Sequence, residues 1–216
     1  NQATQINYMQ FCIYARNFCR QYFGTEKVQV LDWGCGLGHN SVLLYDLGFR
    51  VCASDIIDCP PDQLPPLTIR PIDYIVLHHQ SQLPFDDQSF DAVFSFGVLE
   101  HVPNEAASLL EIHRILRPGG LFFCFNLPYS YSWGQRFVHL RGHYYHDRLY
   151  KESYIKRILP QYGYNLLDLW HLMLFPKISI NYGRFSPVME HIDQLLINYT
   201  PLRYLATSLN FTASKK

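Results

Sequence analysis

Three glycines and two aspartates stand close together in the sequence and could together hold a ligand. Asp32 is followed by Gly34, Gly36 and Gly38 at alternate positions, and Asp55 comes 17 residues after the last glycine. Because glycine has no Cβ, a segment rich in it turns sharply and lets a ligand approach the backbone closely. A carboxylate at the end of the next strand can accept hydrogen bonds from both hydroxyls of a ribose. The spacing therefore predicts a site for a compound that contains a nucleoside.

The same spacing argues against a dinucleotide. The G-x-G-x-x-G motif of dinucleotide-binding loops requires a glycine three positions after Gly36, where this chain has His39. A carboxylate at Asp55 would also repel a 2′-phosphate on a ribose. A nicotinamide or flavin cofactor is therefore disfavoured.

Histidines are the candidates for proton transfer, because histidine titrates near neutral pH. His101 follows an apolar run, directly after Glu100, and His143 and His146 stand later in LRGHYYHDRLY. Each has a structural alternative, in which His101 braces a loop and the later two cap a helix at the surface. Glu100 and His101 could also ligate a metal, but two ligands do not define a site. The sequence therefore predicts no metal centre.

Alternating helices and strands must position these residues. Apolar spacing predicts helices over 5–23, 40–47, 105–116, 151–159 and 188–199. Short apolar runs predict strands over 28–32, 49–55, 72–77, 90–97, 121–126, 165–172 and 204–213, with a turn at RPGG, 117–120. The central runs are continuously apolar, which is typical of a parallel sheet covered on both faces. Ligands of such sheets bind at the carboxyl ends of the strands.

The composition is that of one folded domain. The chain has 216 residues, of which 48% are hydrophobic, and its 18 basic residues balance 18 acidic ones. This balance gives no electrostatic reason to expect nucleic acid as a partner. No apolar run in the sequence is long enough to cross a bilayer. The six cysteines show no metal-binding spacing, which favours free thiols and a cytoplasmic location.

Three motifs resemble, in order and spacing, those of the class I S-adenosylmethionine (SAM) methyltransferases. VLDWGCGLGHNS resembles their D-x-G-C-G-x-G loop, LPFDDQSFDAVFSFGVLEHVPN their fourth-strand block, and EIHRILRPGGLFFCFN their L-x-P-G-G segment. The resemblance covers about residues 28–127. It implies a Rossmann-like three-layer α/β sandwich with a seven-stranded, mostly parallel sheet. It also implies an enzyme that moves the methyl group of SAM to a small-molecule acceptor by direct displacement.

The resemblance also implies which residues bind the cofactor. The loop beneath the methionine part would be formed by Asp32, Gly34, Cys35, Gly36 and Gly38. Asp55 would hold the ribose hydroxyls, and Ile56 would pack on the adenine. At the position of the family's adenine-binding Asp this chain has His79, followed by Gln80, and Ser95 and Phe96 would line the amino acid end. Trp33, which is bulky for this loop, is interpreted as a core aromatic residue.

These assignments divide a single domain, 1–216, into the helix 5–23, a cofactor-binding core 28–127, an acceptor-side region 128–200 and the last strand 204–213. Within that region, 173–200 is interpreted as a packing helix with its connections, or alternatively as a substrate lid. The favoured function is methyl transfer to a hydroxyl of a sugar, polyketide or quinone-type metabolite. The alternative is a non-catalytic accessory domain of a larger assembly, to which the unusual adenine position and the initial Asn1 point. Neither the acceptor nor the oligomeric state is predicted from the sequence.

Overall fold

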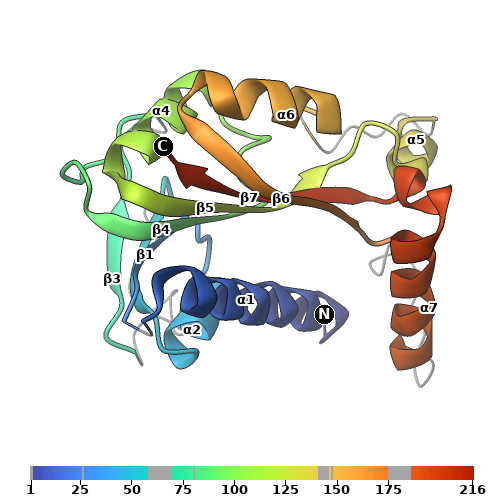
Figure 1. The fold of residues 1–216 in the computed structure, drawn as a ribbon, viewed down its shortest axis with the longest axis horizontal. Coiled ribbons are helices and arrows are strands. Elements are labelled where there is room, and N and C mark those ends of the chain that lie inside the picture. The colour runs from blue at the N-terminus through green and yellow to red at the C-terminus, as the bar shows by residue number, and fades with distance from the viewer. Residues whose placement is uncertain are drawn as a thin grey trace.

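The chain, described here from a computed structural model, forms a sheet with helices packed on both faces (Figure 1). The structure describes residues 2–25, 27–57, 70–79, 81–140, 146, 148–174 and 186–216. The elements in chain order are α1 (Gln2–Phe23), β1 (Gln29–Trp33), α2 (His39–Asp46), β2 (Arg50–Asp55), β3 (Asp73–Val76), β4 (Phe90–Phe96), α4 (Glu105–Ile115), β5 (Leu116–Pro128), α5 (Trp133–Leu140), α6 (Glu152–Gln161), β6 (Tyr164–Leu172), α7 (Ser186–Tyr199), the 3-10 helix η3 (Pro201–Leu205) and β7 (Ser208–Lys215).

The sheet has seven strands in the order β3-β2-β1-β4-β5-β7-β6. β1 to β5 pair in parallel, whereas β7 runs antiparallel to both of its neighbours, β5 and β6. The mostly parallel, seven-stranded Rossmann-like sheet predicted from the sequence is therefore confirmed. The carboxyl ends of the parallel strands meet at one edge, where connecting loops can form a site.

Both faces of the sheet are buried, which explains why its central strands are apolar throughout. Along β5, Phe122 packs in one core layer with Leu109 of α4, while Phe123 and Phe125 pack in the other with α1. Phe11 of α1 stacks on Phe125 with ring centroids 4.6 Å apart. Figure 1 shows α1 and α2 on one side of the sheet and α4 and α6 on the other.

The described cysteines and helices agree with the sequence reading. Cys12, Cys19, Cys35, Cys52 and Cys124 are buried free thiols, and burial raises the pKa of Cys19 and Cys52 to about 12. The predicted helix over 188–199 lies within α7. Among the residues described, none of the helices combines the length and apolar character needed to cross a membrane.

Two predicted boundaries are wrong. β5 begins at Leu116, so RPGG lies inside this strand, where the pairing with β4 shifts register between Phe90 and Ala92. The final strand begins at Ser208 rather than at residue 204, because the residues just before it form η3. The Thr200 side chain accepts a hydrogen bond from Leu202 N at 3.1 Å and thereby starts a helical turn where the apolar pattern indicated a strand.

Candidate functional site

The loop between β1 and α2 is shaped by three glycines with left-handed backbone conformations. Gly34, Gly36 and Gly38 have φ values of +72°, +55° and +75°, which other residues adopt only with strain. The amides of Gly34 and Cys35 both donate to the Ser54 carbonyl, at 2.8 and 3.0 Å. These hydrogen bonds fix the loop to the end of β2.

Gly34 is also required by close packing. A Cβ at this position would lie 2.4 Å from Cγ2 of Val98, which follows β4. The absence of a side chain therefore lets the loop after β1 contact the loop after β4. The two loops therefore lie against each other at the carboxyl edge of the sheet.

Asp55 is held by the backbone of its neighbours at the end of β2. Asp55 is 7% exposed. Its Oδ2 accepts a hydrogen bond from Gly36 N at 2.7 Å, and its Oδ1 accepts one from Ile57 N at 3.1 Å. Each carboxylate oxygen has a second lone pair, so it can accept a further hydrogen bond. The carboxylate is thus fixed in position and still able to bind hydroxyl groups.

Asp32 supports the loop from below. It is 1% exposed, and its Oδ2 accepts a hydrogen bond from the Ser41 hydroxyl at 2.6 Å, which connects the end of β1 to α2. Burial raises the pKa of Asp32 to about 7, the Ser41 hydrogen bond lowers it, and the negative charge of Asp55 raises it further. Because Asp32 is covered by protein, it supports the site by holding the loop in place.

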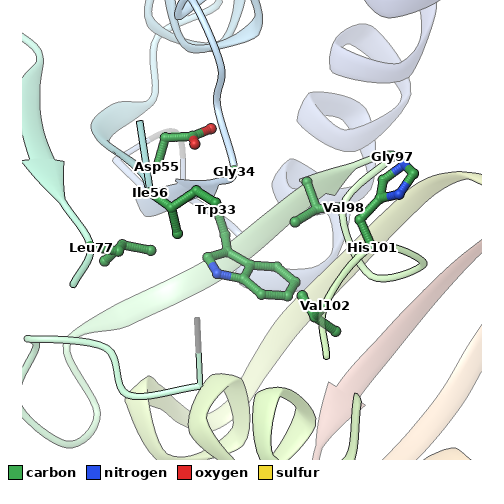
Figure 2. Close-up of a pocket in the computed structure, with 9 residues that line it drawn as sticks. All are labelled: Trp33, Gly34, Asp55, Ile56, Leu77, Gly97, Val98, His101 and Val102. Atoms are coloured by element: carbon green, nitrogen blue, oxygen red, sulfur yellow. The ribbon is translucent and has the colours of Figure 1, made fainter. Parts of the chain in front are cut away.

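A cavity of about 230 Å³ opens at the carboxyl edge of the sheet, beside the glycine loop. Figure 2 shows Asp55 toward one end of the lining residues and His101 at the other, with Val98 between them and the indole of Trp33 below them. The lining residues are Trp33, Gly34, Asp55, Ile56, Leu77, Gly97, Val98, His101 and Val102. Trp33 is 2% exposed and belongs to the core, as expected, and one surface of it also forms the cavity floor.

The structure brings four of the predicted site residues around this cavity: Gly34, Asp55, Ile56 and His101. Cys35, Gly36 and Gly38 lie in the adjoining loop without lining it. Ser95 and Phe96 are buried in β4, and the lining begins one residue later, at Gly97. His79 is exposed and does not line the cavity, and Gln80 and His143 lie outside the described residues.

Besides Trp33, which was interpreted only as a core residue, the sequence reasoning missed four lining residues: Leu77, Gly97, Val98 and Val102. Leu77, Gly97 and Val98 stand one or two positions after the ends of β3 and β4. The rule that ligands bind beyond the carboxyl ends of parallel strands would have found them. Val102 comes later in the loop, and its position has no such signal.

The His101 end of the cavity contains a cluster of a carboxylate and two imidazoles. Glu100 Oε1 lies 3.8 Å from His101 Nε2 and 4.0 Å from His146 Nδ1. The Glu100 side chain is 2% exposed, and burial raises its pKa, whereas a backbone hydrogen bond and the neighbouring Arg148 lower it. Arg148 donates to the carbonyls of Leu99 and Val102, both at 3.1 Å. These hydrogen bonds connect Arg148, two residues after His146, to the loop that carries Glu100.

The sheet defines a Rossmann-like α/β fold, as comparison with solved structures shows. The Burkholderia thailandensis 1,6-didemethyltoxoflavin-N1-methyltransferase, solved with 1,6-didemethyltoxoflavin and S-adenosylhomocysteine, superposes with a TM-score of 0.64 at 19% identity. The superposition covers 95% of this chain and 78% of that one. At this identity the likeness establishes the fold.

Sequence comparison finds similarity to methyltransferases over part of the chain. Residues 31–124 match the family model described as "Methyltransferase domain". Sterol 4-C-methyltransferase strm-1 of Caenorhabditis elegans is 29% identical over 107 residues, which are 48% of this chain and 32% of that protein. Malonyl-[acyl-carrier protein] O-methyltransferase of Serratia marcescens is 34% identical over 94 residues, 43% of this chain and 36% of that protein. The matched segment thus spans about a third of each of these relatives.

The matched family model is that of a methyltransferase domain, and the solved structure holds S-adenosylhomocysteine, the product that the cofactor SAM leaves after methyl transfer. The residues present fit that cofactor. Asp55 is a fixed carboxylate with acceptor capacity for ribose hydroxyls, and Ile56 and Leu77 offer apolar surface beside it for the adenine ring. Gly34 lines the cavity, and its lack of a side chain lets the loop pack against Val98 there.

Proposed function

We propose that this chain transfers the methyl group of SAM to an oxygen of a small-molecule acceptor, which enters the cavity at the His101 end. The single observation that carries the proposal is the cavity itself, with the Asp55 carboxylate at one end and the His101 imidazole at the other. When bound, SAM supplies a methyl group on a positively charged sulfur. The chain then has to orient the acceptor and assist the loss of its proton.

In this proposal the cofactor binds at the Asp55 end of the cavity. Asp55 binds the ribose hydroxyls, Ile56 and Leu77 contact the adenine, and the loop from Gly34 to Gly38 passes beneath the methionine part. The support for these roles is the fixed carboxylate of Asp55 and the close contact of the Gly34 loop with Val98. Asp32 keeps the loop in place through Ser41.

The residues at the His101 end of the cavity favour an oxygen atom as the methyl acceptor. A hydroxyl must lose its proton as it is methylated, and the cluster of Glu100, His101 and His146 can assist this. The relatives do not decide the atom, because their names specify carbon, oxygen and nitrogen. His101 lines the cavity and is therefore the residue of the cluster that contacts the acceptor.

Two measurements test the proposal. Calorimetric titration should show binding of SAM and S-adenosylhomocysteine, and a failure of both to bind below millimolar concentration would overturn it. A screen of metabolite pools with methyl-labelled SAM should then give labelled products that are ethers or esters. His101→Gln should lower the turnover number by about 10²-fold or more, with a smaller effect on S-adenosylhomocysteine affinity than Asp55→Asn has.

A further inference from the structure

The cluster beside the cavity has the composition of a metal site as well as of a proton-transfer site. One ligand atom each from Glu100, His101 and His146 lies within 4.8 Å of the other two. Glu100 and His101 come from the loop after β4, and His146 comes from the segment that precedes α6. The fold thus adds a third ligand to the two adjacent ones that the sequence already contained.

The distances suit a shared cation better than direct hydrogen bonds. Glu100 Oε1 is 3.8 Å from His101 Nε2 and 4.0 Å from His146 Nδ1, beyond the about 3.2 Å limit of a good hydrogen bond. Ligand atoms that each bind one metal at about 2.0–2.2 Å lie about 3–4 Å apart. A cation placed among these three atoms would therefore need only small side-chain adjustments.

Burial of Glu100 is the second observation that points to a cation. Its side chain is 2% exposed, and its Oε2 is buried and accepts no hydrogen bond from the residues that the structure describes. A carboxylate removed from water is costly unless a positive charge or a metal compensates it. The cluster is also preorganised, since Arg148 bonds to the carbonyls of Leu99 and Val102 on either side of Glu100 and His101.

The position of the cluster gives such a cation a role. His101 lines the cofactor cavity, so a metal bound to it would have its remaining coordination positions near that space. Catalytic metal sites keep such open positions for water or substrate, and a hydroxyl bound to the metal gives up its proton to water more easily. Imidazole ligands favour Zn²⁺ or Fe²⁺ over Mg²⁺ and Ca²⁺.

We propose that Glu100, His101 and His146 bind a divalent transition-metal cation, and that this cation holds the acceptor by a hydroxyl or enol oxygen. The cation site stands on the geometry of the cluster alone, whereas its task rests on the function proposed above. His101 then contacts the acceptor through the metal and is not itself the base.

The test is calorimetric titration of the chelator-treated full chain with Zn²⁺, with Mg²⁺ as the comparison ion. The wild type should bind Zn²⁺ at a single site with micromolar or tighter affinity and bind Mg²⁺ far more weakly. Glu100→Gln and His146→Ala should each weaken Zn²⁺ binding about tenfold or more. His191→Ala, which removes an exposed imidazole on α7, is the matched control and should bind as the wild type does.

Binding of S-adenosylhomocysteine to each variant reports whether it is folded and tests the cofactor site separately. If a variant fails to fold, X-ray absorption of the zinc-loaded wild type serves as the test in its place. The spectrum should show two imidazole ligands, oxygen ligation and no sulfur. Weak Zn²⁺ binding, equal binding by all variants, or sulfur ligation would overturn the proposed site. If Zn²⁺ binds as expected but no acceptor is methylated, the proposed function fails and the metal site stands.

Discussion

The two ends of the cavity are built in different ways. At the Asp55 end the geometry comes from the backbone, through left-handed glycines and the amides of Gly36 and Ile57. At the His101 end it comes from side chains of two separate segments, which Arg148 connects. A site built from backbone has little tolerance for a change of residue, because a new Cβ alters the fold of the loop. A site built from side chains can change its chemistry while the fold is kept.

The strongest test of this difference is Gly34→Ala. The added Cβ would meet Val98 at 2.4 Å and would sit at a φ of +72°, so the free energy of unfolding should fall by about 2–4 kcal/mol. Affinity for S-adenosylhomocysteine should fall at least about tenfold with it. Urea unfolding and calorimetry measure the two effects. The double variant Gly34→Ala/Val98→Ala should recover the packing part only, and a wild-type-like single variant would contradict the backbone account.

The next largest effect is expected from Asp55→Asn. Loss of the charge weakens hydrogen bonds to the ribose hydroxyls, so affinity for S-adenosylhomocysteine should fall about 100-fold. Calorimetric titration measures it. Asp46→Asn, which removes an exposed carboxylate paired with Arg70, is the control and should leave the affinity unchanged. Equal losses in both variants would mean that Asp55 has no specific place in cofactor binding.

Asp32 allows a test by pH. Its folded pKa of about 7 lies above its ordinary value of 3.8, so its contribution to stability is complete below the ordinary value and is lost as the pH rises through 7. Between about pH 5 and pH 8 the wild type should lose about 2–3 kcal/mol relative to Asp32→Asn. Urea unfolding of both proteins at the two pH values measures this. If the free energy of unfolding changed equally with pH in both proteins, Asp32 would have its ordinary pKa in the folded state.

The smallest effect is expected from a change at an ion pair that lies outside the cavity. Glu152 of α6 lies 3.2 Å from Nε2 of His171 on β6, in a part of the chain beyond the family match. Glu152→Gln should lower the free energy of unfolding by less than about 1 kcal/mol and leave S-adenosylhomocysteine affinity within about twofold. A large loss of cofactor affinity, measured by calorimetry, would contradict the confinement of cofactor binding to the residues around the cavity.

The sequence predicted the sheet well and pointed to Gly34, Asp55 and Ile56, which the structure brings to one cavity, because both are encoded by local spacing. Gly34, Asp55 and Ile56 stand within a short stretch, and the strands that precede them are continuous apolar runs. The carboxylate–imidazole cluster was different. Glu100 and His146 are far apart in the chain, and no spacing rule predicts that His146 lies beside the loop after β4. The same limit explains η3, where the Thr200 cap overrides an apolar pattern that indicated a strand.

The antiparallel insertion of β7 between β5 and β6 has a consequence for the order of folding. β6 reaches the rest of the sheet only through β7, yet β7 is made after it, so β6 has no partner strand while it emerges from the ribosome. β1 to β5, by contrast, can pair among themselves as soon as each is synthesised. The glycine loop and Asp55 can therefore assemble early, whereas the β6 side waits for long-range contacts, which form slowly. A nascent chain would thus form the glycine loop and Asp55 before the β6–β7 side of the sheet is complete.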